Sequence, residues 1–307
     1  MSAPAVALHL VLLLLAPPLV LGIAVKVKAW LAGRRGAPLL QPYHDLRKLL
    51  GKGTVRGEGT TWVFAAGPLV GLAAVLVAGL LVPLAGGAAP LGFAGDVIAF
   101  AALLSLGRFF TMAAALDTGS SFEGMGASRE AAFGAFTEPG LFLVLALICL
   151  PARSAGLAQA WAARPAGVAW LAHPLYLLAA VVLFVVLLAE NARIPIDDPA
   201  THLELTMVHE VMVLDHGGPD LAFVLYGEAV KLFVIAALLV HLLLPVPPGG
   251  WAGAVALLAG EAAVAGLVGV VEGSVARLRL PRVPGFLIGA AALAAVGVAV
   301  LFARGRP

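Results

Sequence analysis

Long apolar runs separated by short polar segments dominate the pattern along this chain. A run of roughly eighteen or more apolar residues is long enough to cross the hydrocarbon core of a bilayer as a helix. The fourth run is the weakest, because Arg129, Glu130, Glu138 and Pro139 interrupt it. The pattern predicts an all-α, polytopic membrane protein with about eight transmembrane helices, at 4–24, 61–84, 91–116, 129–150, 168–190, 221–245, 251–272 and 284–303.

The distribution of Lys and Arg between the connecting segments predicts how the chain sits in the membrane. Alternate connections, at about 25–60, 117–129, 191–220 and 273–283, carry 13 of the 19 basic residues, whereas the opposite side carries 4. Because basic loops stay in the cytoplasm, we expect these four loops to be cytoplasmic and both termini to face outward. We see no separate soluble domain, so we expect residues 1–307 to form a single integral membrane domain.

The composition supports the membrane assignment and narrows the chemistry. Of the 307 residues 62% are apolar and 12% are charged, and the mean hydropathy is +1.04. A soluble domain of this length could not bury so much apolar surface. The single cysteine, Cys149, excludes an intrachain disulfide and a cysteine-based cluster or zinc site within the chain. No phosphate-binding loop or dinucleotide fingerprint is present, and we expect no nucleic-acid partner.

A basic segment, QPYHDLRKLLGKGTV at 41–55, has the pattern of an amphipathic helix. Three leucines recur at helical spacing opposite three basic residues: Leu46, Leu49 and Leu50 against Arg47, Lys48 and Lys52. The pattern suits a helix that lies in the membrane interface, with its basic residues near anionic lipid. An ordinary basic loop is the alternative.

The segment ENARIPIDDPATHLELTMVHE at 190–210 gathers acids in a chain that has few. Asp198 followed by Pro199 is a helix start, with an Asp cap and Pro at the first helical position, so we expect a helix over about 199–213. This helix would be charged and apolar at once, and so would need cover from lipid, neighbouring helices or a partner protein. Its ionisable residues are candidates for a coupling loop: Glu190, Arg193, Asp197, Asp198, Glu204 and Glu210.

A metal site in this segment is disfavoured. His209 and Glu210 begin an HExxH motif, but the second imidazole would have to come from position 213, which is Val213. His202 lies two turns from His209, too far for the two to be adjacent ligands without help.

Ionisable residues inside the apolar runs are better indicators of function than the possible metal ligands are. A charge in lipid is costly, so such residues face a protein interior or water. Glu228 and Lys231 are three apart on one expected helix and can pair. Structural ion pairs and a proton relay are both open interpretations of the whole set: Arg108, Glu138, Glu228, Lys231 and Glu261, with Asp96, Glu190 and Glu272 nearer the ends.

Several longer motifs resemble one known family. They are QPYHDLRKLL (41–50), LDTGSSFEGMGASRE (116–130) with FTEP (136–139), ENARIPIDDPATHLELTMVHE (190–210) and GPDLA (218–222) leading to Glu228. Together they resemble the membrane-anchor subunit of energy-converting (group 4) NiFe hydrogenases, of the formate hydrogenlyase and hydrogenase-4 type. That family is in turn similar to the NADH dehydrogenase subunit 1 family of respiratory complex I.

Departures from the complex I pattern favour the hydrogenase branch. Where complex I subunits usually show ETNRAPFDLPEAEAEL, this chain has ENARIPIDDPATHLEL, with Ala200 and His202 in place of expected acids. The usual Tyr-Ser-Gly is here His216, Gly217 and Gly218. The hydrogenase branch generally passes electrons to protons, so a quinone is expected only if the chain belongs to the complex I branch.

The resemblance implies a role in coupling rather than in catalysis. The cytoplasmic loops would dock against an iron–sulfur small subunit and a NiFe large subunit, which hold the cofactors, while this chain holds none. Antiporter-like membrane subunits would be its partners within the bacterial or archaeal cytoplasmic (inner) membrane. A buried polar path toward them would use Arg108, Arg129, Glu138, Glu228 and Lys231.

The expected function is therefore that of a membrane subunit that couples hydrogenase-like redox chemistry to proton or sodium translocation. One alternative is the quinone-site subunit of a complex I-like NADH dehydrogenase. Another, from a different class, is a stand-alone ion transporter.

Overall fold

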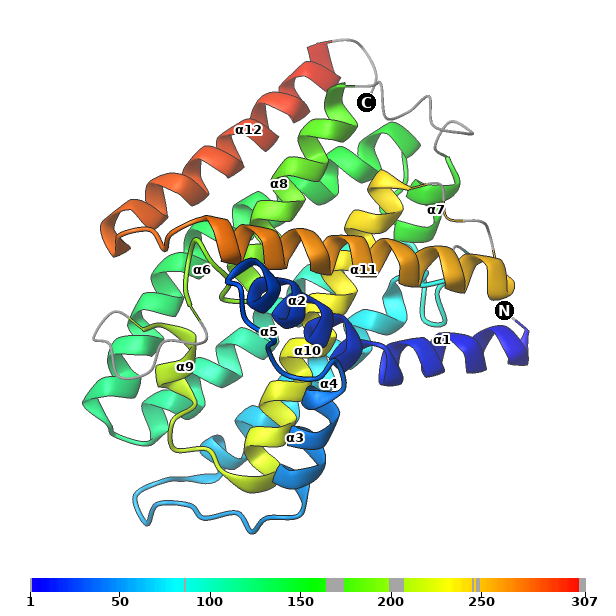
Figure 1. Cartoon of the computed structure of the whole chain (residues 1–307). Helices are drawn as coiled ribbons and strands as arrows, with labels where there is room; N and C mark the ends of the chain where they lie inside the picture. The colour runs from blue at the N-terminus through cyan, green and yellow to red at the C-terminus, as the bar shows by residue number, and fades with distance from the viewer. Residues whose placement is uncertain are drawn as a thin grey trace.

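The structure is a computed structural model that describes residues 2–85, 87–163, 174–198, 207–244, 246 and 249–303. Over these residues all regular secondary structure is helical, and no strand occurs, which confirms the all-α prediction. The elements longer than ten residues (Figure 1) are α1 (Ala3–Leu15), α2 (Pro17–Leu31), α4 (Trp62–Leu81), α5 (Asp96–Asp117), α6 (Ser121–Cys149), α8 (Pro174–Glu190), α10 (Gly218–Leu243), α11 (Gly250–Ser274) and α12 (Val283–Ala303).

Of the eight predicted apolar runs, seven each overlap one α-helix, and the first, 4–24, overlaps two, α1 and α2. Six helices are long and apolar enough to cross a membrane, and α1 with α2, bent by 41°, makes a seventh if the pair is one span. The fifth run corresponds to α8, an apolar helix of which the structure describes 17 residues, from Pro174 to Glu190. Six or seven spans are thus supported by length and composition, and the outward placement of the termini stays a prediction.

Shorter helices lie in the connections: α3 (Gln41–Leu50), α7 (Leu157–Ala162) and α9 (His209–Met212), with single 3-10 turns η1 (Leu150–Ala152) and η3 (Leu280–Arg282). The predicted amphipathic helix is present as α3, which packs against α10 and α2. Its half-buried side includes Leu46 and Leu49, whereas Leu50 is exposed together with Arg47 and Lys48. Part of the leucine face therefore covers protein.

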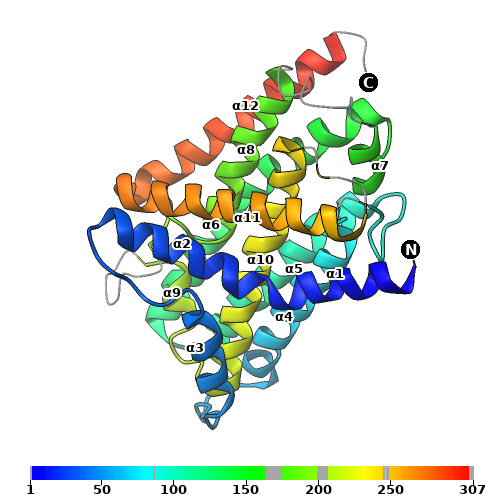
Figure 2. The same ribbon diagram turned by 45° about the vertical axis from the view of Figure 1, so that its right-hand side comes forward.

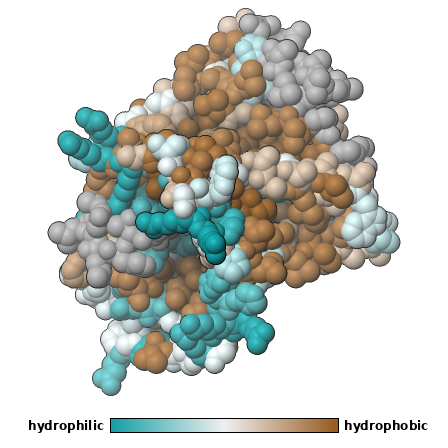
Figure 3. Space-filling view, in the orientation of Figure 1, coloured by the Kyte–Doolittle hydropathy of each residue, from teal (hydrophilic) through white to brown (hydrophobic). Residues whose placement is uncertain are grey.

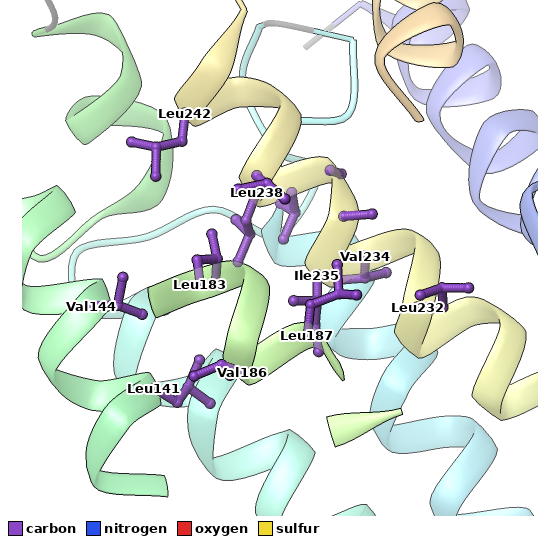
Figure 4. Close-up of a cluster of buried hydrophobic side chains, with 14 of the residues drawn as sticks. Leu141, Val144, Leu183, Val186, Leu187, Leu232, Val234, Ile235, Leu238 and Leu242 are labelled. Carbon is purple, nitrogen blue, oxygen red and sulfur yellow. The ribbon is translucent and has the colours of Figure 1, made fainter. Parts of the chain in front are cut away.

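The centre of the molecule is α10. Every side chain from Leu232 to Leu239 is at most 1% exposed, so this stretch is enclosed on all sides, as expected of a helix that is apolar all round. It packs against α4, α8, α11 and α2. Figure 4 shows leucine, isoleucine and valine side chains of α10 beside Leu183 and Leu187 of α8. The apolar surface of α11, α1 and α12 forms much of the face in Figure 3, with polar residues gathered around α2 and α3.

A proline pair explains the bend between α1 and α2. Pro17 and Pro18 lack the N–H groups that would continue the helical hydrogen bonds, which leaves carbonyl groups of α1 without helical donors. The hydroxyl of Tyr226, on α10, donates to the carbonyl of Leu14 at 2.9 Å. The hydroxyl of Tyr43, on α3, donates to the carbonyl of Leu15. The bent pair is thus tied to α3 and α10, and α2 continues alongside α11 (Figures 1 and 2).

Connections that are distant in sequence meet at one end of the bundle. Asp117 accepts hydrogen bonds from the backbone N–H of Thr61 at 2.7 Å and from its hydroxyl at 2.8 Å. Arg56 pairs with Asp220 at 3.1 Å, across the start of α10. These contacts join the connection before α4 to the end of α5 and to the start of α10, and we call this end of the bundle the polar end.

A glycine in the first turns of α6 lets the site-bearing helix α9 pack closely. A Cβ atom on Gly126 would lie 2.3 Å from a methyl carbon of Val211 and 2.9 Å from the carbonyl oxygen of Val208. The Gly126 position is therefore filled by the chain around α9. At Gly124, two residues earlier, the nearest atom to an added Cβ is 4.0 Å away, on Leu116.

We predict that Gly126→Ala destabilises the protein and Gly124→Ala does not. The first variant must displace the backbone around α9, at a cost of about 1–3 kcal/mol. The second adds helix propensity of up to about 1 kcal/mol. Thermal unfolding of the purified protein in detergent, followed by circular dichroism, measures both. Equal midpoints for the two variants would contradict the packing described for α9.

Candidate functional site

A buried arginine gathers three carboxylates in the membrane interior. The side chain of Arg108, on α5, is 8% exposed. Its Nε lies 3.3 Å from Glu130 and its Nη1 2.8 Å from Glu138, both on α6. Its Nη2 pairs with Glu190, the last residue of α8. The planar fork of the guanidinium can meet several carboxylates at once, so Arg108 joins three helices through one side chain.

The space for this guanidinium comes from a missing side chain. A Cβ atom on Gly134 of α6 would lie 2.6 Å from Nη1 of Arg108. Glu138 has a further partner, since the hydroxyl of Ser105 donates to its Oε1 at 2.9 Å. Glu138 thus accepts two hydrogen bonds from α5, one from a neutral donor and one from a charged donor.

A second pair links α9 to α10. Nε2 of His209 pairs with Oε1 of Glu228. Burial alone would lower the pKa of His209, but the neighbouring carboxylate of Glu228 outweighs burial and raises that pKa. Lys231, one turn further along α10, is near enough to interact electrostatically with both Glu228 and Glu190. Lys231 therefore lies between the two clusters of charge.

One cavity connects these groups. It has a volume of about 60 Å³ and lies between α4, α5 and α10. Since about 10–15 Å³ is enough for one water molecule, there is room for several. The polar part of its wall consists of Arg108, Glu130, His209, Glu228 and Lys231, with Thr111. The remaining wall is mostly apolar and includes Gly67, Gly71, Gly107 and Gly227. Such a cavity can carry protons by water between fixed ionisable groups.

A smaller cavity of about 10 Å³ extends from the same cluster to the loop after α8. Its wall includes Arg108 and Glu130 on one side and Asp197 and Val208 on the other. The two cavities share the Arg108–Glu130 pair. The Arg108–Glu130 pair therefore stands between the cavity inside the bundle and the one beside Asp197.

Asp197 fixes the position of His209. Its Oδ2 accepts hydrogen bonds from the backbone N–H groups of Val208 at 3.2 Å and His209 at 3.1 Å. Its Oδ1 pairs with Arg277, in the connection after α11, at 2.7 Å. The carboxylate is 4% exposed, so its charge depends on these partners for compensation. Any movement of Asp197 would move the backbone that carries His209.

A further ion-pair network joins the same loop to α2 and α11. Arg193 pairs with Glu272 at 3.1 Å. Lys28, near the end of α2, lies 3.4 Å from Glu272 and 3.5 Å from Asp198. The backbone N–H of Leu278 also donates to the carbonyl of Pro195 at 2.9 Å. Ion pairs and a backbone hydrogen bond therefore hold the loop to the end of α11 and to the connection after it.

Most of the residues selected from the sequence come together here, with some differences. Glu228 pairs with His209. The spacing of Glu228 and Lys231 on α10 would allow an ion pair between them, but none is present among the described residues. Arg129 donates to the carbonyl of Met207 at 2.8 Å and so supports the chain before α9. Glu210 lies in α9 and is half-buried. Glu204, His202 and most of the helix expected over 199–213 lie outside the described residues, while 209–212 is helical as α9.

Two important residues were not selected as site residues from the sequence. Glu130 is eight positions before Glu138, and this spacing of just over two helical turns puts both on one face of α6, a signal that could have revealed it. His209 was considered only as a metal ligand, and its partner Glu228 is 19 positions away on another helix. In the part of the chain that the structure describes, no group of three His, Cys, Asp or Glu side chains could hold a metal ion.

Glu261 is buried apart from these clusters. It lies in the middle of α11 and is fully enclosed, and neither carboxyl oxygen has a hydrogen-bond partner among the described residues. Asp96, at the start of α5, is buried at the opposite end of the bundle, where it accepts the backbone N–H of Leu157 at 2.8 Å. These two acids are therefore not members of the connected site.

Comparisons with known proteins give a consistent result. The sequence profile of the family described as NADH dehydrogenase matches residues 4–303. Hydrogenase-4 component C of Escherichia coli is 33% identical over 235 residues, which covers 76% of this chain and 73% of the relative. Formate hydrogenlyase subunit 4 of Escherichia coli is 31% identical over 279 residues, or 87% and 88% of the two chains.

A third relative belongs to the respiratory branch. It is an NADH-quinone oxidoreductase subunit of Anaplasma phagocytophilum, 30% identical over 249 residues, which covers 74% of this chain and 70% of the relative. The fold is similar to a chain in the structure of the membrane-bound sulfane sulfur reductase, an archaeal respiratory membrane complex. That match has a TM-score of 0.82 at 22% identity and covers 97% of this chain and 99% of the other. The apolar helices and these relatives show a multi-pass membrane protein whose relatives are components of larger complexes.

We predict a pH dependence of stability that originates at His209. Because the folded pKa of His209 is raised above its ordinary value of 6.5, the stabilisation should be complete below that pH and lost as pH rises through the raised pKa. The measured quantity is the difference in thermal midpoint between wild type and His209→Gln across this pH range, which should shrink as pH rises. His44→Gln, on the exposed side of α3, is the control. A difference that is independent of pH would contradict the ion pair.

Proposed function

The chain belongs to the NADH dehydrogenase family of the complex I subunit 1 type, and we propose that it is the membrane subunit of a hydrogenase or formate hydrogenlyase-like complex. In this role it anchors an iron–sulfur and NiFe arm and couples the redox chemistry of that arm to translocation of protons or sodium ions. One observation carries the proposal. Two cavities share Arg108 and Glu130 in their walls, and their ionisable wall residues, with the Arg108–Glu138 ion pair, extend from Asp197, at the polar end, to Glu138 and Lys231 inside the bundle.

The geometry suits transfer of charge through the line. Ionisable residues at membrane depth are expensive and commonly mark ion pathways. His209 can hold or release a proton beside Glu228, and the cavity brings both within reach of Lys231 and the Arg108 cluster. Arg108 keeps its charge and orients the three carboxylates around it. Glu130, Glu138 and Glu190 then supply positions between which a proton or cation can pass.

The segment from Glu190 to Asp198, the first part of the coupling loop, supplies the coupling. Asp197 holds the backbone of His209 and is paired with Arg277, while Arg193 and Asp198 connect the same loop to Glu272 and Lys28. A partner that shifted this loop would change the His209–Glu228 contact without entering the membrane. Redox events in a soluble arm docked on this end could therefore reach the cavity. Glu204 and Glu210 belong to the same proposed coupling loop.

The proposal also covers the partner subunits of the chain and the membrane in which the complex lies. The small iron–sulfur subunit and the NiFe large subunit would dock on the end formed by the loops at 25–60, 117–129, 191–220 and 273–283. Antiporter-like membrane subunits would receive the polar path. The complex would lie in the cytoplasmic (inner) membrane of a bacterium or archaeon.

The complex I branch is the second candidate, and the similarity to the NADH-quinone oxidoreductase relative favours it. In that case the chain would contribute to a quinone site. Purification of the native complex separates the candidates: a NiFe-bearing large subunit supports the hydrogenase role, and NADH- or quinone-linked subunits support the other. A chain that translocates ions alone would be a stand-alone transporter and would contradict both.

We predict that Glu228→Gln and Glu138→Gln preserve assembly but reduce ion translocation coupled to turnover, by about tenfold or more, as expected for removal of a positioned proton-transfer group. Translocation by the complex in sealed vesicles, measured against turnover in the same preparation, tests this. Glu58→Gln, an exposed change in the connection before α4, is the matched control. If both buried variants translocate as the control does, these acids are packing groups and the relay is wrong.

We predict that Asp197→Asn separates redox turnover from translocation or weakens docking of the soluble arm. The variant keeps the size of the side chain but removes the charge that pairs with Arg277 and orients the backbone of His209. Subunit content after purification and the ratio of ions moved to electrons transferred are the measurements. Asp45→Asn, on the exposed side of α3, should leave both unchanged. A normal ratio in a fully assembled Asp197→Asn complex would remove Asp197 from the coupling mechanism.

A further inference from the structure

We propose that His216 is a positioning residue for the His209–Glu228 contact, and that protonation of its ring releases the connection that holds this contact together. The inference rests on the proposed function, to which it adds regulation by the pH of the compartment that the polar end faces. It combines the place of His216 between α9 and α10 with a buried ring nitrogen that has no partner among the described residues.

His216 lies between the two helices whose contact it would control. Because α9 ends at Met212 and α10 begins at Gly218, residues 213–217 are the whole of what we call the α9–α10 connection. Figure 1 shows it running to the end of the bundle where the segment before α4 also lies. The backbone N–H of His216 donates to the carbonyl of Val213 at 3.1 Å and closes a turn there. A displaced His216 would therefore shift α9, which is too short to be stable by itself.

The ring packs on an aromatic side chain and leaves one of its nitrogens unsatisfied. It stacks on the ring of Phe64, in the first turn of α4, with the centroids 4.0 Å apart and the planes inclined by 15°. His216 is 6% exposed, and in the part of the chain that the structure describes its buried Nδ1 has no hydrogen-bond partner. A neutral ring tolerates this site, because Nδ1 can be the nitrogen without a proton. A protonated ring would leave its Nδ1–H as a buried donor without an acceptor, which is costly.

Two acids and an arginine near the ring determine how it responds to a proton. Asp220, in the first turn of α10, pairs with Arg56 at 3.1 Å, and Asp215 immediately precedes His216. Burial disfavours a protonated ring and Arg56 repels it, whereas the two carboxylates attract it. Burial outweighs the acids and lowers the pKa of His216 below its ordinary value of 6.5. The native arrangement thus keeps the ring neutral, and a protonated ring gains by leaving Phe64 for these acids.

Two further acids hold the backbone on either side of the stacked rings. The backbone N–H of Asp215 donates to Glu123, in the first turn of α6, at 3.2 Å. The backbone N–H of Phe64 donates to Asp117, the last residue of α5, at 3.1 Å. A displacement of His216 would therefore disturb contacts of the connection with α4 and α6 as well as with α10.

The resulting pH dependence has a definite sign. Because the folded pKa of His216 is lowered, the stabilisation by the neutral ring is complete above pH 6.5 and is lost as pH falls below that value toward the lowered pKa. His209 has the opposite sign, since its pKa is raised and its stabilisation is lost as pH rises. The contact between α9 and α10 is consequently held best in a window of pH between these two losses.

Hydrogen–deuterium exchange of the purified complex, at about pH 7.5 and about pH 5.5, tests the release. His216→Phe keeps a ring on Phe64 but cannot take a proton, and a comparison at equal pH cancels the effects of His209 and of pH on intrinsic exchange. For residues 209–217 the rate in wild type relative to His216→Phe should rise about tenfold between the two pH values, the limit for one linked proton. His44→Gln, on the exposed side of α3, should follow wild type. A relative rate that is the same at both pH values would overturn the proposal.

A second variant tests the stacking without altering the histidine. Phe64→Leu removes the aromatic partner and leaves His216 able to titrate. It should raise the exchange of residues 209–217 already at about pH 7.5, while α11 keeps wild-type exchange and so shows that the chain has folded. Wild-type exchange of 209–217 in this variant would overturn the proposal.

The functional measurement is the number of ions translocated per electron transferred, in sealed vesicles with the same pH on both sides. This quotient removes the effect of pH on turnover by the soluble subunits. It should fall in wild type between about pH 7.5 and about pH 5.5, and it should not fall in His216→Phe. Identical pH profiles would overturn His216 as a positioning residue. A complex that translocates no ions at any pH would reject the proposed function, and the exchange measurement would still decide whether His216 controls the connection.

Discussion

Charge compensation around one buried guanidinium organises the membrane interior of this protein. Arg108 enters a region where an unpaired charge is costly, and three carboxylates from α6 and α8 surround it. Helix packing, the absence of a side chain at Gly134 and the placement of the two cavities all accommodate this group. With one cation and three acids, the cluster gains from further positive charge nearby, and Lys231 and a protonated His209 are the residues at hand.

The contact between His209 and Glu228 in the interior depends on the polar end of the molecule through Asp197. This carboxylate touches α9 by two backbone hydrogen bonds and the connection after α11 by an ion pair. Because α9 has only four residues, it has little helical stability of its own and takes its position from these contacts and from the close approach to Gly126. The position of His209 beside Glu228 is consequently a property of the surrounding loops as much as of α10.

The sequence predicted the helices well because a span is a local property: a long apolar run needs only its own residues to be recognised. It also selected Arg108, Glu138, Glu190 and Glu228, since a charge inside such a run stands out. It could not predict that Arg108 meets Glu190, 82 positions away, or that His209 meets Glu228, because these contacts are made by packing of separate helices. The spacing of Glu228 and Lys231 along one helix suggested that these two residues pair. In the structure Glu228 pairs instead with His209, which comes from a separate helix.

The bend between α1 and α2 has a consequence for the order in which the protein can be completed. Pro17 and Pro18 leave the end of α1 dependent on hydroxyl donors from outside it. Those donors, Tyr43 and Tyr226, follow their acceptors by 28 and 212 positions in the chain. During synthesis the first helix therefore reaches the bilayer with its hydrogen bonding unfinished, and only the arrival of the sixth long apolar run closes it. Biogenesis of the N-terminal helices is in this sense not finished until most of the polypeptide has been made.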